Sequence, residues 1–244
     1  MKSVNVYWAP FTDVQGFNAS HTYLPLRSVF EETFPSRNTD NTTPSFFQCP
    51  ATSSLMKNTF VMRSPVEQKI KVSESKADVS VPKNREKSTH IKAEIFHQPT
   101  IVNQKLVYLN HPFIMFSEED LMATLTAPFF EKSNLSNYGM VVPGQFNIGK
   151  WFRPLNSEVN LWDGLSEIHL SVGDALCYVQ MQTERPINLR RFQINKRLTD
   201  IALGLVHNKP LSKLARMSEN YRVFEESKLK KLILKEITEN LLDD

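Results

Sequence analysis

The stretch SEIHLSVGDALCYVQMQT, Ser166–Thr183, decides the fold class of this chain. Every second residue from Ile168 to Val172 is apolar, and so is every second residue from Ala175 to Met181. This period of two is typical of strands with one buried face. The Gly173-Asp174 pair between the two runs favours a tight turn. The stretch therefore predicts a β-hairpin.

Similar alternation recurs along the chain and extends this prediction to a whole domain. Strands are expected over Val4–Ala9, Asn58–Ser64 and Ile187–Ile194, and over Leu106–Leu109 and Phe113–Phe116, with 110–112 as a break between the last two. Prolines recur between such segments, and proline is excluded from central strands and helix interiors. We expect a mainly β protein, an antiparallel β-sandwich or jelly-roll-like core over residues 1–195. Residues 73–89 lack aromatic residues, Leu and Ile, which favours a solvated loop or the tip of a hairpin.

The last part of the chain, residues 196–244, changes to a helical period. Apolar residues from Leu198 to Leu205 recur at helical spacing, and Ser218 could cap a later helix. Leu229, Leu232, Ile233, Ile237 and Leu241 form an apolar stripe. An amphipathic terminal helix must bury its stripe. It either packs on its own sheet or mediates self-association, and the sequence leaves both open.

Composition limits the classes of partner. A net charge of +3 on 244 residues is too small to predict nucleic-acid binding. No segment approaches the ~20 apolar residues of a membrane span, and the first residues do not resemble a signal peptide. We therefore expect a cytoplasmic protein that does not bind membranes.

The stretch GQFNIGKW, residues 144–151, resembles a phosphate-binding loop but fails two tests. Such a loop must open a helix whose N-terminal amides face the anion, and a Ser or Thr must follow its Lys. Here Trp151 stands in the hydroxyl position, and Pro154 follows in extended sequence. We expect these glycines to flank a strand.

Catalytic and metal-binding patterns are weak throughout the sequence. No HxH, HxD or HExxH motif occurs, so a metal would need His97 or His111 paired with a distant carboxylate. Cys49 and Cys177 lack the spacing of a metal site, and both are expected to be buried, reduced thiols. No catalytic, cofactor-binding or metal-binding residue is predicted.

The richest polar and aromatic stretch, residues 144–163, is the candidate surface for a ligand or protein partner. Its candidate residues are Lys150, Trp151, Arg153, Trp162 and Asp163. Trp and Arg are enriched at binding hot spots, although the same residues also occur as core and rim. The sequence leaves open whether Trp151 fills the core or lines a pocket.

Three segments resemble uncharacterised proteins of large tailed phages of marine bacteria. They are CPATSSLMKNTFVMRSP (49–65), PGQFNIGKWFRPL (143–155) and GDALCYVQMQT (173–183). The chain is also distantly similar to a bacterial domain family of unknown function, over residues 45–195. The resemblance implies a phage origin and a β-sandwich core, and it transfers no catalytic residues.

These observations favour a non-enzymatic binding or assembly protein whose partner is another protein or a second copy of the chain. The alternative is a small-molecule enzyme on a jelly-roll or β-barrel. It would be either oxygenase-like with a metal at dispersed histidines or nucleotide hydrolase-like. An inhibitor of a host pathway is a third hypothesis without support from particular residues.

Overall fold

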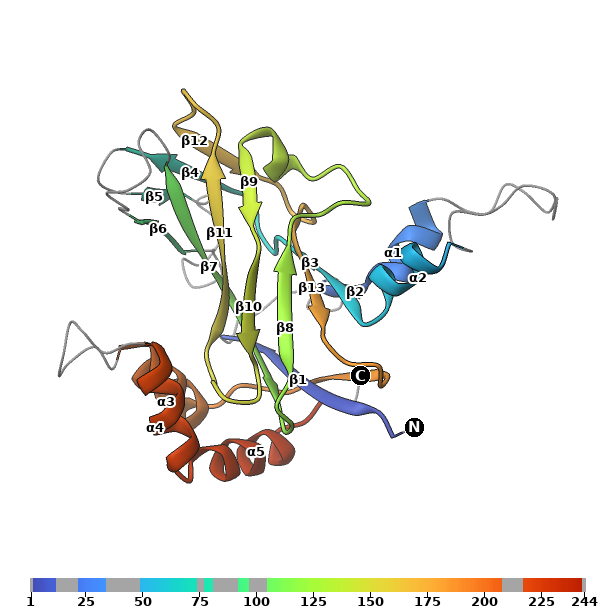
Figure 1. Cartoon of the computed structure of the whole chain (residues 1–244). Coiled ribbons are helices and arrows are strands. Elements are labelled where there is room, and N and C mark those ends of the chain that lie inside the picture. Colours follow the sequence, from blue (N-terminus) through green and yellow to red (C-terminus); the bar gives the residue numbers. More distant parts are fainter. Residues whose placement is uncertain are drawn as a thin grey trace.

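The computed structural model describes residues 2–11, 22–33, 49–73, 77–80, 92–96, 105–207 and 217–242. Within these ranges the chain forms three sheets, with helices at two places (Figure 1). The expected mainly β class with C-terminal helices is confirmed. Among the described residues, the named strands pair antiparallel, except that β1 pairs parallel with β14.

The three sheets have the following composition. Sheet A has the order β14-β1-β7-β11-β9, and β6 also pairs with β7. Its strands are β1 (Val4–Pro10), β6 (Lys92–Phe96), β7 (Leu106–Ser117), β9 (Gly139–Val142), β11 (Pro154–Leu161) and β14 (Ile187–Arg191). Sheet B has the order β10-β8-β13-β3-β2, with β2 (Tyr23–Pro25), β3 (Thr59–Arg63), β8 (Met122–Thr126), β10 (Gly144–Asn147) and β13 (Ala175–Met181). Sheet C has the order β12-β4-β5, with β4 (Gln68–Val72), β5 (Ala77–Ser80) and β12 (Glu167–Leu170).

The main core lies between the inner faces of these sheets. Every second residue of β1 faces it, namely Val4, Val6 and Trp8, as the sequence predicted. Trp8 packs edge-on against Tyr23 of β2, with ring centres 5.2 Å apart. Because a strand turns successive side chains to opposite faces, the other residues of β1 face outward.

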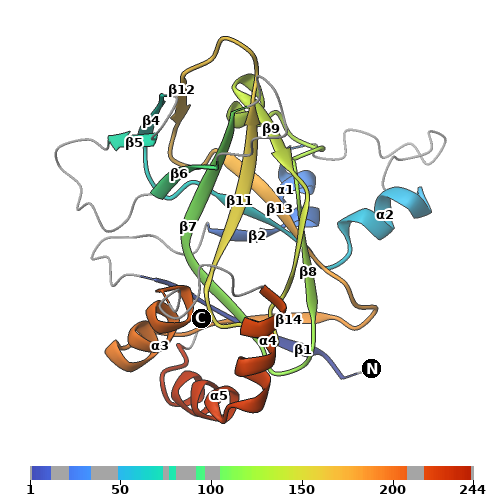
Figure 2. The ribbon, with the colours of Figure 1, turned by 60° about the vertical axis from the view of Figure 1, so that its left-hand side comes forward.

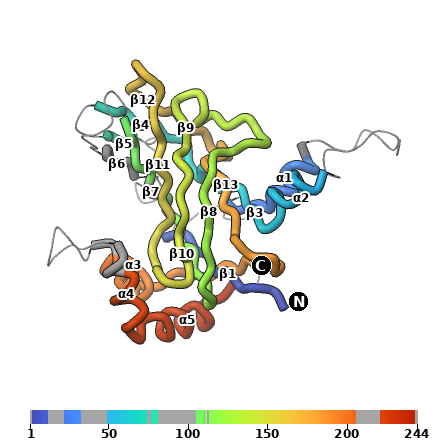
Figure 3. The backbone as a smooth tube through the Cα atoms, in the orientation of Figure 1, coloured from blue at the N-terminus to red at the C-terminus, as the bar shows by residue number. Residues whose placement is uncertain are grey.

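A continuous extended path joins sheets A and B along one side of the molecule. β9 pairs with β11, and after Pro143 the chain continues as β10, which pairs with β8 (Figure 3). Pro143 lacks the N–H that a ladder position would need, so the change of partner falls where proline removes a donor. The sandwich is therefore linked along this side by one chain segment.

The predicted hairpin over Ser166–Thr183 is wrong. β12 pairs with β4, and β13 pairs with β3 and β8, so the two runs lie in different sheets. β12 and β13 follow one another along β4 and β3, so the four strands form a two-stranded antiparallel ribbon that bends between sheets C and B. At the bend the amide of Ser64 donates to Asp174 O at 2.8 Å, and the amide of Gly173 donates to Ser64 O at 2.9 Å. Gly173 has φ +86°, so glycine serves a corner between sheets rather than a hairpin.

Two smaller predictions are also corrected. β7 runs through residues 110–112 without ending, and the irregularity there appears only as a register shift against β11. Within the expected loop 73–89, Ala77–Ser80 form strand β5, while 74–76 and 81–89 lie outside the described residues.

Three C-terminal helices cover the outer face of half of sheet A (Figure 2). They are α3 (Lys196–His207), α4 (Met217–Glu226) and α5 (Leu229–Glu239), and we call them the helical cap. In the second half of β7, Phe113 and Met115 face the main core, whereas Ile114 and Phe116 face the cap. Phe116 packs edge-on against Phe224 of α4, with ring centres 6.3 Å apart.

The apolar stripe of the last helix is therefore satisfied within the chain. Ile233 and Ile237 are fully buried against the outer face of sheet A, with Leu229 and Leu241 partly buried beside them. α4 begins at Met217, so Ser218 lies inside the helix and not at its cap position.

Polar contacts and a short strand pairing fix the cap in place. Glu236 of α5 accepts hydrogen bonds from Asn195 at 2.9 Å and from Arg197 at 2.7 Å. These contacts, that of Asn195 first, lower the pKa of Glu236. After α5, Leu242 donates to Arg191 O, and Gln193 donates to Asn240 O, so residues 240–242 pair with the last residue of β14 and the two residues that follow it.

Two further helices, α1 (Leu26–Thr33) and α2 (Pro50–Met56), lie on the outer face of sheet B (Figure 1). Leu26, Val29 and Met56 pack there on Val61 and Tyr178. No helix of the described part of the chain is both long and apolar enough to cross a membrane.

The cap packing gives a direct test. Phe224 is 1% exposed, whereas its neighbour Val223 is 56% exposed. We expect Phe224→Ala to lower the free energy of unfolding by about 3–5 kcal/mol, because truncating a buried aromatic leaves a cavity. The matched change Val223→Ala should stay within about 0.5 kcal/mol of the wild type. Urea unfolding measures both, and equal losses would contradict this packing.

Candidate functional site

Lys150 and Trp151 lie in the turn between β10 and β11, and both contact the helical cap. The Lys150 ammonium pairs with Glu225 of α4, and with Asp120 at 3.2 Å. These hydrogen bonds, that to Glu225 first, raise the pKa of Lys150. Trp151 is buried and packs edge-on against Tyr221 of α4 at 5.0 Å. Trp151 therefore belongs to the junction between core and cap and does not line an open pocket.

The resemblance of this turn to a phosphate loop has a structural explanation. Extended structure follows it, because β11 begins at Pro154. A Cβ on Gly149 would lie 2.0 Å from the backbone oxygen of Glu119, so the glycine permits close approach of two backbone segments. Lys150 already pairs with two carboxylates. The turn is a packing element.

Arg153 stacks between two aromatic rings just before β11 begins. Its guanidinium carbon lies 5.2 Å from the centre of the Phe146 ring and 5.1 Å from that of Trp151. This is the range of cation–π contacts, which contribute about 0.5–1 kcal/mol at exposed sites and more when desolvated. Arg153 thus joins Lys150 and Trp151 in one cluster.

Trp162 and Asp163 lie at the opposite end of β11, so the predicted surface divides into two. Trp162 is 46% exposed, and its indole N–H donates to Ser136 O at 3.0 Å. Its backbone amide donates to Tyr138 O, one step beyond the pairing of β11 with β9. Asp163 is exposed in the following turn. Of the five predicted residues, Trp162 and Asp163 are exposed, Lys150 and Arg153 are half-buried, and Trp151 is buried.

The outward residues of β11 add polar groups that the sequence analysis missed. Leu155, Val159 and Leu161 face the main core, so alternation places Asn156, Glu158 and Asn160 on the other face. Met140 of β9 pairs with Asn160 in register and is 49% exposed. We call Asn156, Glu158, Asn160, Trp162 and Met140 the β11 outer face. The regular alternation from Leu155 to Leu161 could have revealed it.

The β11 outer face carries two amides and one carboxylate, from Asn156, Asn160 and Glu158. The Oδ1 atoms of Asn156 and Asn160 are buried and accept no hydrogen bond in the structure. Asn156 is only 8% exposed. Glu158 is half-buried and forms no ion pair with any residue that the structure describes. Buried acceptors without donors are costly and therefore mark a place to examine.

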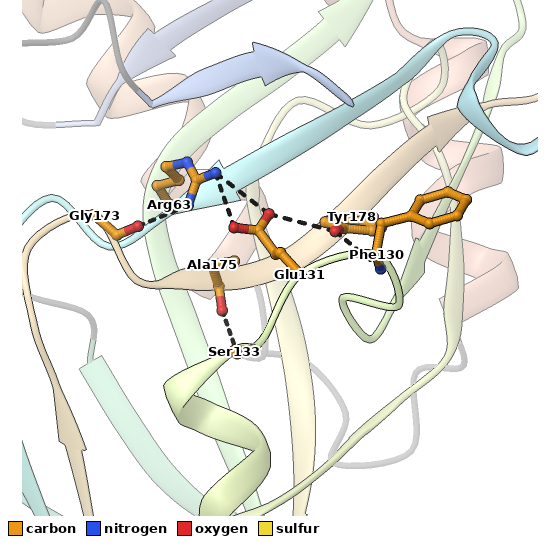
Figure 4. Close-up of polar contacts among 7 residues, drawn as sticks. All are labelled: Arg63, Phe130, Glu131, Ser133, Gly173, Ala175 and Tyr178. Carbon is orange, nitrogen blue, oxygen red and sulfur yellow. Dashed lines mark hydrogen bonds and ion pairs between the residues drawn. The ribbon is translucent and has the colours of Figure 1, made fainter. Parts of the chain in front are cut away.

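A second polar cluster fixes the segment after β8 on sheet B (Figure 4). Arg63 contacts both carboxylate oxygens of Glu131 at 3.0 and 3.3 Å and donates to Gly173 O at 2.9 Å. Tyr178 donates to Glu131 at 3.3 Å, and burial, followed by the charge of Glu131, raises the pKa of Tyr178. All the partners in this cluster are satisfied by one another, so it reads as structural.

Only one of the two histidines considered for a metal lies in the described part of the chain. His97 lies outside the described residues. His111 is buried inside the sandwich, where its Nε2 lies 2.8 Å from Ser157 Oγ, and burial lowers its pKa to about 3. Within the described ranges, no group of three His, Cys, Asp or Glu residues could hold a metal ion. A buried serine–histidine pair of this kind lacks access for a substrate.

The two cysteines are free but differ in environment. Cys177 is buried, and burial raises the pKa of its thiol. The prediction that Cys49 is buried is wrong, because it is exposed at the start of α2. Hydrogen bonds from the amides of Thr52 and then Ala51 lower the pKa of the Cys49 thiol. A thiolate at a helix start is favoured by the orphan amides there.

A shallow pocket of about 330 Å³ opens between β1 and α5. Its lining residues are Tyr7, Glu118, Leu234, Lys235, Thr238 and Glu239. Lys235 pairs with Glu239 at 3.8 Å, so the lining carries both signs of charge. Such a lining selects no class of ligand.

The lowered pKa of His111 predicts how stability depends on pH. The folded state keeps His111 neutral down to about pH 3, whereas an unfolded histidine protonates near pH 6.5. Between these two pH values only the unfolded state binds the proton, which favours unfolding. This histidine therefore does not lower the free energy of unfolding above pH 6.5 and lowers it progressively as the pH falls toward 3. Between pH 7 and 4.5 the wild type should lose about 2–3 kcal/mol more than His111→Gln. Urea unfolding at the two pH values measures this, and the same loss in both proteins would refute it.

The two thiols should also react differently. In the native protein a disulfide reagent should modify Cys49 rapidly, because the thiolate must be both formed and accessible. It should modify Cys177 only after denaturant is added. Cys49→Ser should abolish the rapid phase and leave the slow one. A rapid phase that survives in Cys49→Ser would assign it to Cys177 and contradict the burial described above.

Comparison of the chain with protein-family models, with curated proteins and with solved structures found no match.

Proposed function

We propose that this chain is a non-enzymatic binding protein that recognises a protein partner through the β11 outer face. The observation that carries the proposal is the exposure of Trp162 and Met140, at 46% and 49%, on the β11 outer face. Trp is enriched at binding hot spots and Met at protein interfaces.

The environment of the reactive groups supports binding over catalysis. His111 and Ser157 are buried together, and Cys177 is buried in the same core. Lys150 and Glu131 are held in ion pairs with described residues. A general acid or base must reach its substrate within hydrogen-bond distance, which these groups do not favour.

The burial of the apolar stripe on α5 makes self-association through that stripe the less favoured form of the assembly hypothesis. With Ile233 and Ile237 packed on sheet A, self-association through that stripe would require the cap to detach. A second copy of the chain would instead have to meet the β11 outer face. The resemblance to phage proteins supports a phage origin and the host cytoplasm as the place of action.

A comparison of three affinity baits tests this proposal. The wild type, Trp162→Ser and the control Leu203→Ser would be exposed to a lysate of the encoding organism. Leu203 is also an exposed apolar residue, but it lies on α3. We expect a partner that the wild type and the control retain and that Trp162→Ser loses by about tenfold or more, as for a hot-spot truncation.

Sedimentation velocity of the same three proteins detects a second copy as the partner. Concentration-dependent association that Trp162→Ser abolishes would identify it. If all three baits retain the same proteins and all three sediment alike, the β11 outer face is not the binding surface.

A further inference from the structure

We propose that the outer edge of β14 binds an extended, acidic segment of a partner protein by strand addition. The site is the part of this edge from Ile187 to Arg191, and we call it the β14 slot. β14 and β9 are the two end strands of sheet A, so the β14 slot lies apart from the β11 outer face. The inference therefore goes beyond the function proposed above and does not depend on it.

The hydrogen bonds between β1 and β14 determine which backbone groups of β14 point away from the sheet. Val4 donates to Pro186 O at 2.9 Å, and Phe192 donates to Trp8 O at 3.0 Å. With the parallel register of the two strands, these bonds direct the even-numbered residues of β14 toward β1. The odd-numbered residues of β14 therefore turn their N–H and C=O groups outward.

Two contacts fill the ends of this outward edge and leave its middle open. At one end the amide of Ile187 donates to Asn58 Oδ1 at 3.3 Å. At the other end Arg191 O accepts a hydrogen bond at 3.0 Å from the antiparallel segment 240–242. No described residue bonds to the outward N–H or C=O of Leu189. The edge thus already carries a short added strand, and the positions before that strand are unpaired.

The geometry of the slot selects an extended segment. An unpaired N–H and C=O on a strand edge present the pattern that a further strand completes. The side chains of Ile187 and Leu189 pack on the main core, so the edge is held in place before any partner binds. Backbone groups that are already ordered lower the cost of binding.

The charge around the slot selects an acidic segment. From residue 185 to residue 199 the sequence has no Asp or Glu. Arg190 and Arg191 form no ion pair with a described residue. Their side chains point to opposite faces of the sheet, so an added strand meets a positive charge on each face. Opposite charges across a strand pair are favourable.

A second copy of the chain fits the slot less well than an acidic segment does. Its own β14 would bring the same two arginines to the slot. Like charges that face one another across a strand pair are unfavourable, and this disfavours pairing of two copies through β14.

Hydrogen exchange of backbone amides, followed by NMR, tests whether the slot is open. In the free protein the amide of Leu189 should exchange at least about a hundredfold faster than those of Asn188 and Arg190, because these two donate to β1. If all three amides are equally protected, another part of the chain fills the slot and the inference is wrong.

Fluorescence anisotropy measures binding of an end-blocked peptide, Glu-Val-Glu-Val-Glu, that carries a neutral fluorophore. We expect this peptide to bind at least about tenfold more tightly than Lys-Val-Lys-Val-Lys. A fully N-methylated version should bind at least about tenfold more weakly, because it has no N–H to donate to the edge. Binding of the acidic peptide should also protect the amide of Leu189 from exchange.

Two variants of the slot are each compared with a matched control. Leu189→Pro removes the outward N–H and leaves the bonds to β1, whereas Leu189→Ala shortens the side chain and keeps the N–H. Only the proline variant should weaken binding of the acidic peptide by about fivefold or more. Arg190→Gln should weaken it by about threefold or more, and Lys231→Gln, at an exposed position on α5, by less than about twofold. Thermal unfolding verifies that each variant is folded.

Four further outcomes would overturn the inference. They are no binding of the acidic peptide at millimolar concentration, equal affinity for the acidic and basic peptides, equal effects of Leu189→Pro and Leu189→Ala, and equal effects of Arg190→Gln and Lys231→Gln. Concentration-dependent sedimentation that Leu189→Pro abolishes would instead assign the slot to a second copy of the chain.

Discussion

The burial of β7 on both faces over its second half is the constraint on which the rest of the structure depends. Phe113 and Met115 enter the main core, and Ile114 and Phe116 would face water if nothing covered them. Each buried side chain of this size stabilises the fold by about 1.5–3 kcal/mol, so the outer face requires a cover. The helical cap provides it, and the turn at residues 148–153 joins cap to core through Lys150 and Trp151. Lys150 and Trp151, two residues of the expected ligand surface, are therefore part of this junction.

The same sheet has a different character above the cap. There the outward residues of β11 are Asn156, Glu158 and Asn160, which need no apolar cover. Helices therefore end where the outer face becomes polar, and Trp162 and Met140 remain exposed beside it. One strand thus has two different faces: its inner face fills the core, and its outer face carries polar side chains. The junction with the cap and the exposed Trp162 lie at opposite ends of β11.

Chain connectivity between sheets explains why the apparent hairpin is not one. The Gly173-Asp174 pair has the residue types of a tight turn, and Gly173 does adopt a left-handed conformation. The strands on either side nevertheless pair with β4 and β3, about a hundred residues earlier in the chain. The residue types of the turn specify a sharp change of chain direction. They do not specify which strands pair on either side of it, and here these are β4 and β3. Cys49 shows a similar limit, because it is exposed although the sequence around it is apolar.

The sequence by itself determined the strand faces and the helical character of the last fifty residues. Val4, Val6 and Trp8 face the core, and α3 begins at Lys196, because alternation and helical period are local properties of a few neighbouring residues. Only the tertiary structure decided which strands pair, where the stripe of α5 is buried, and that Trp151 and Trp162 occupy opposite ends of β11. Each of these features depends on contacts between segments that are far apart in the sequence. The packing of the whole chain sets which segments meet and in what register, and this leaves no signal in a short stretch of sequence.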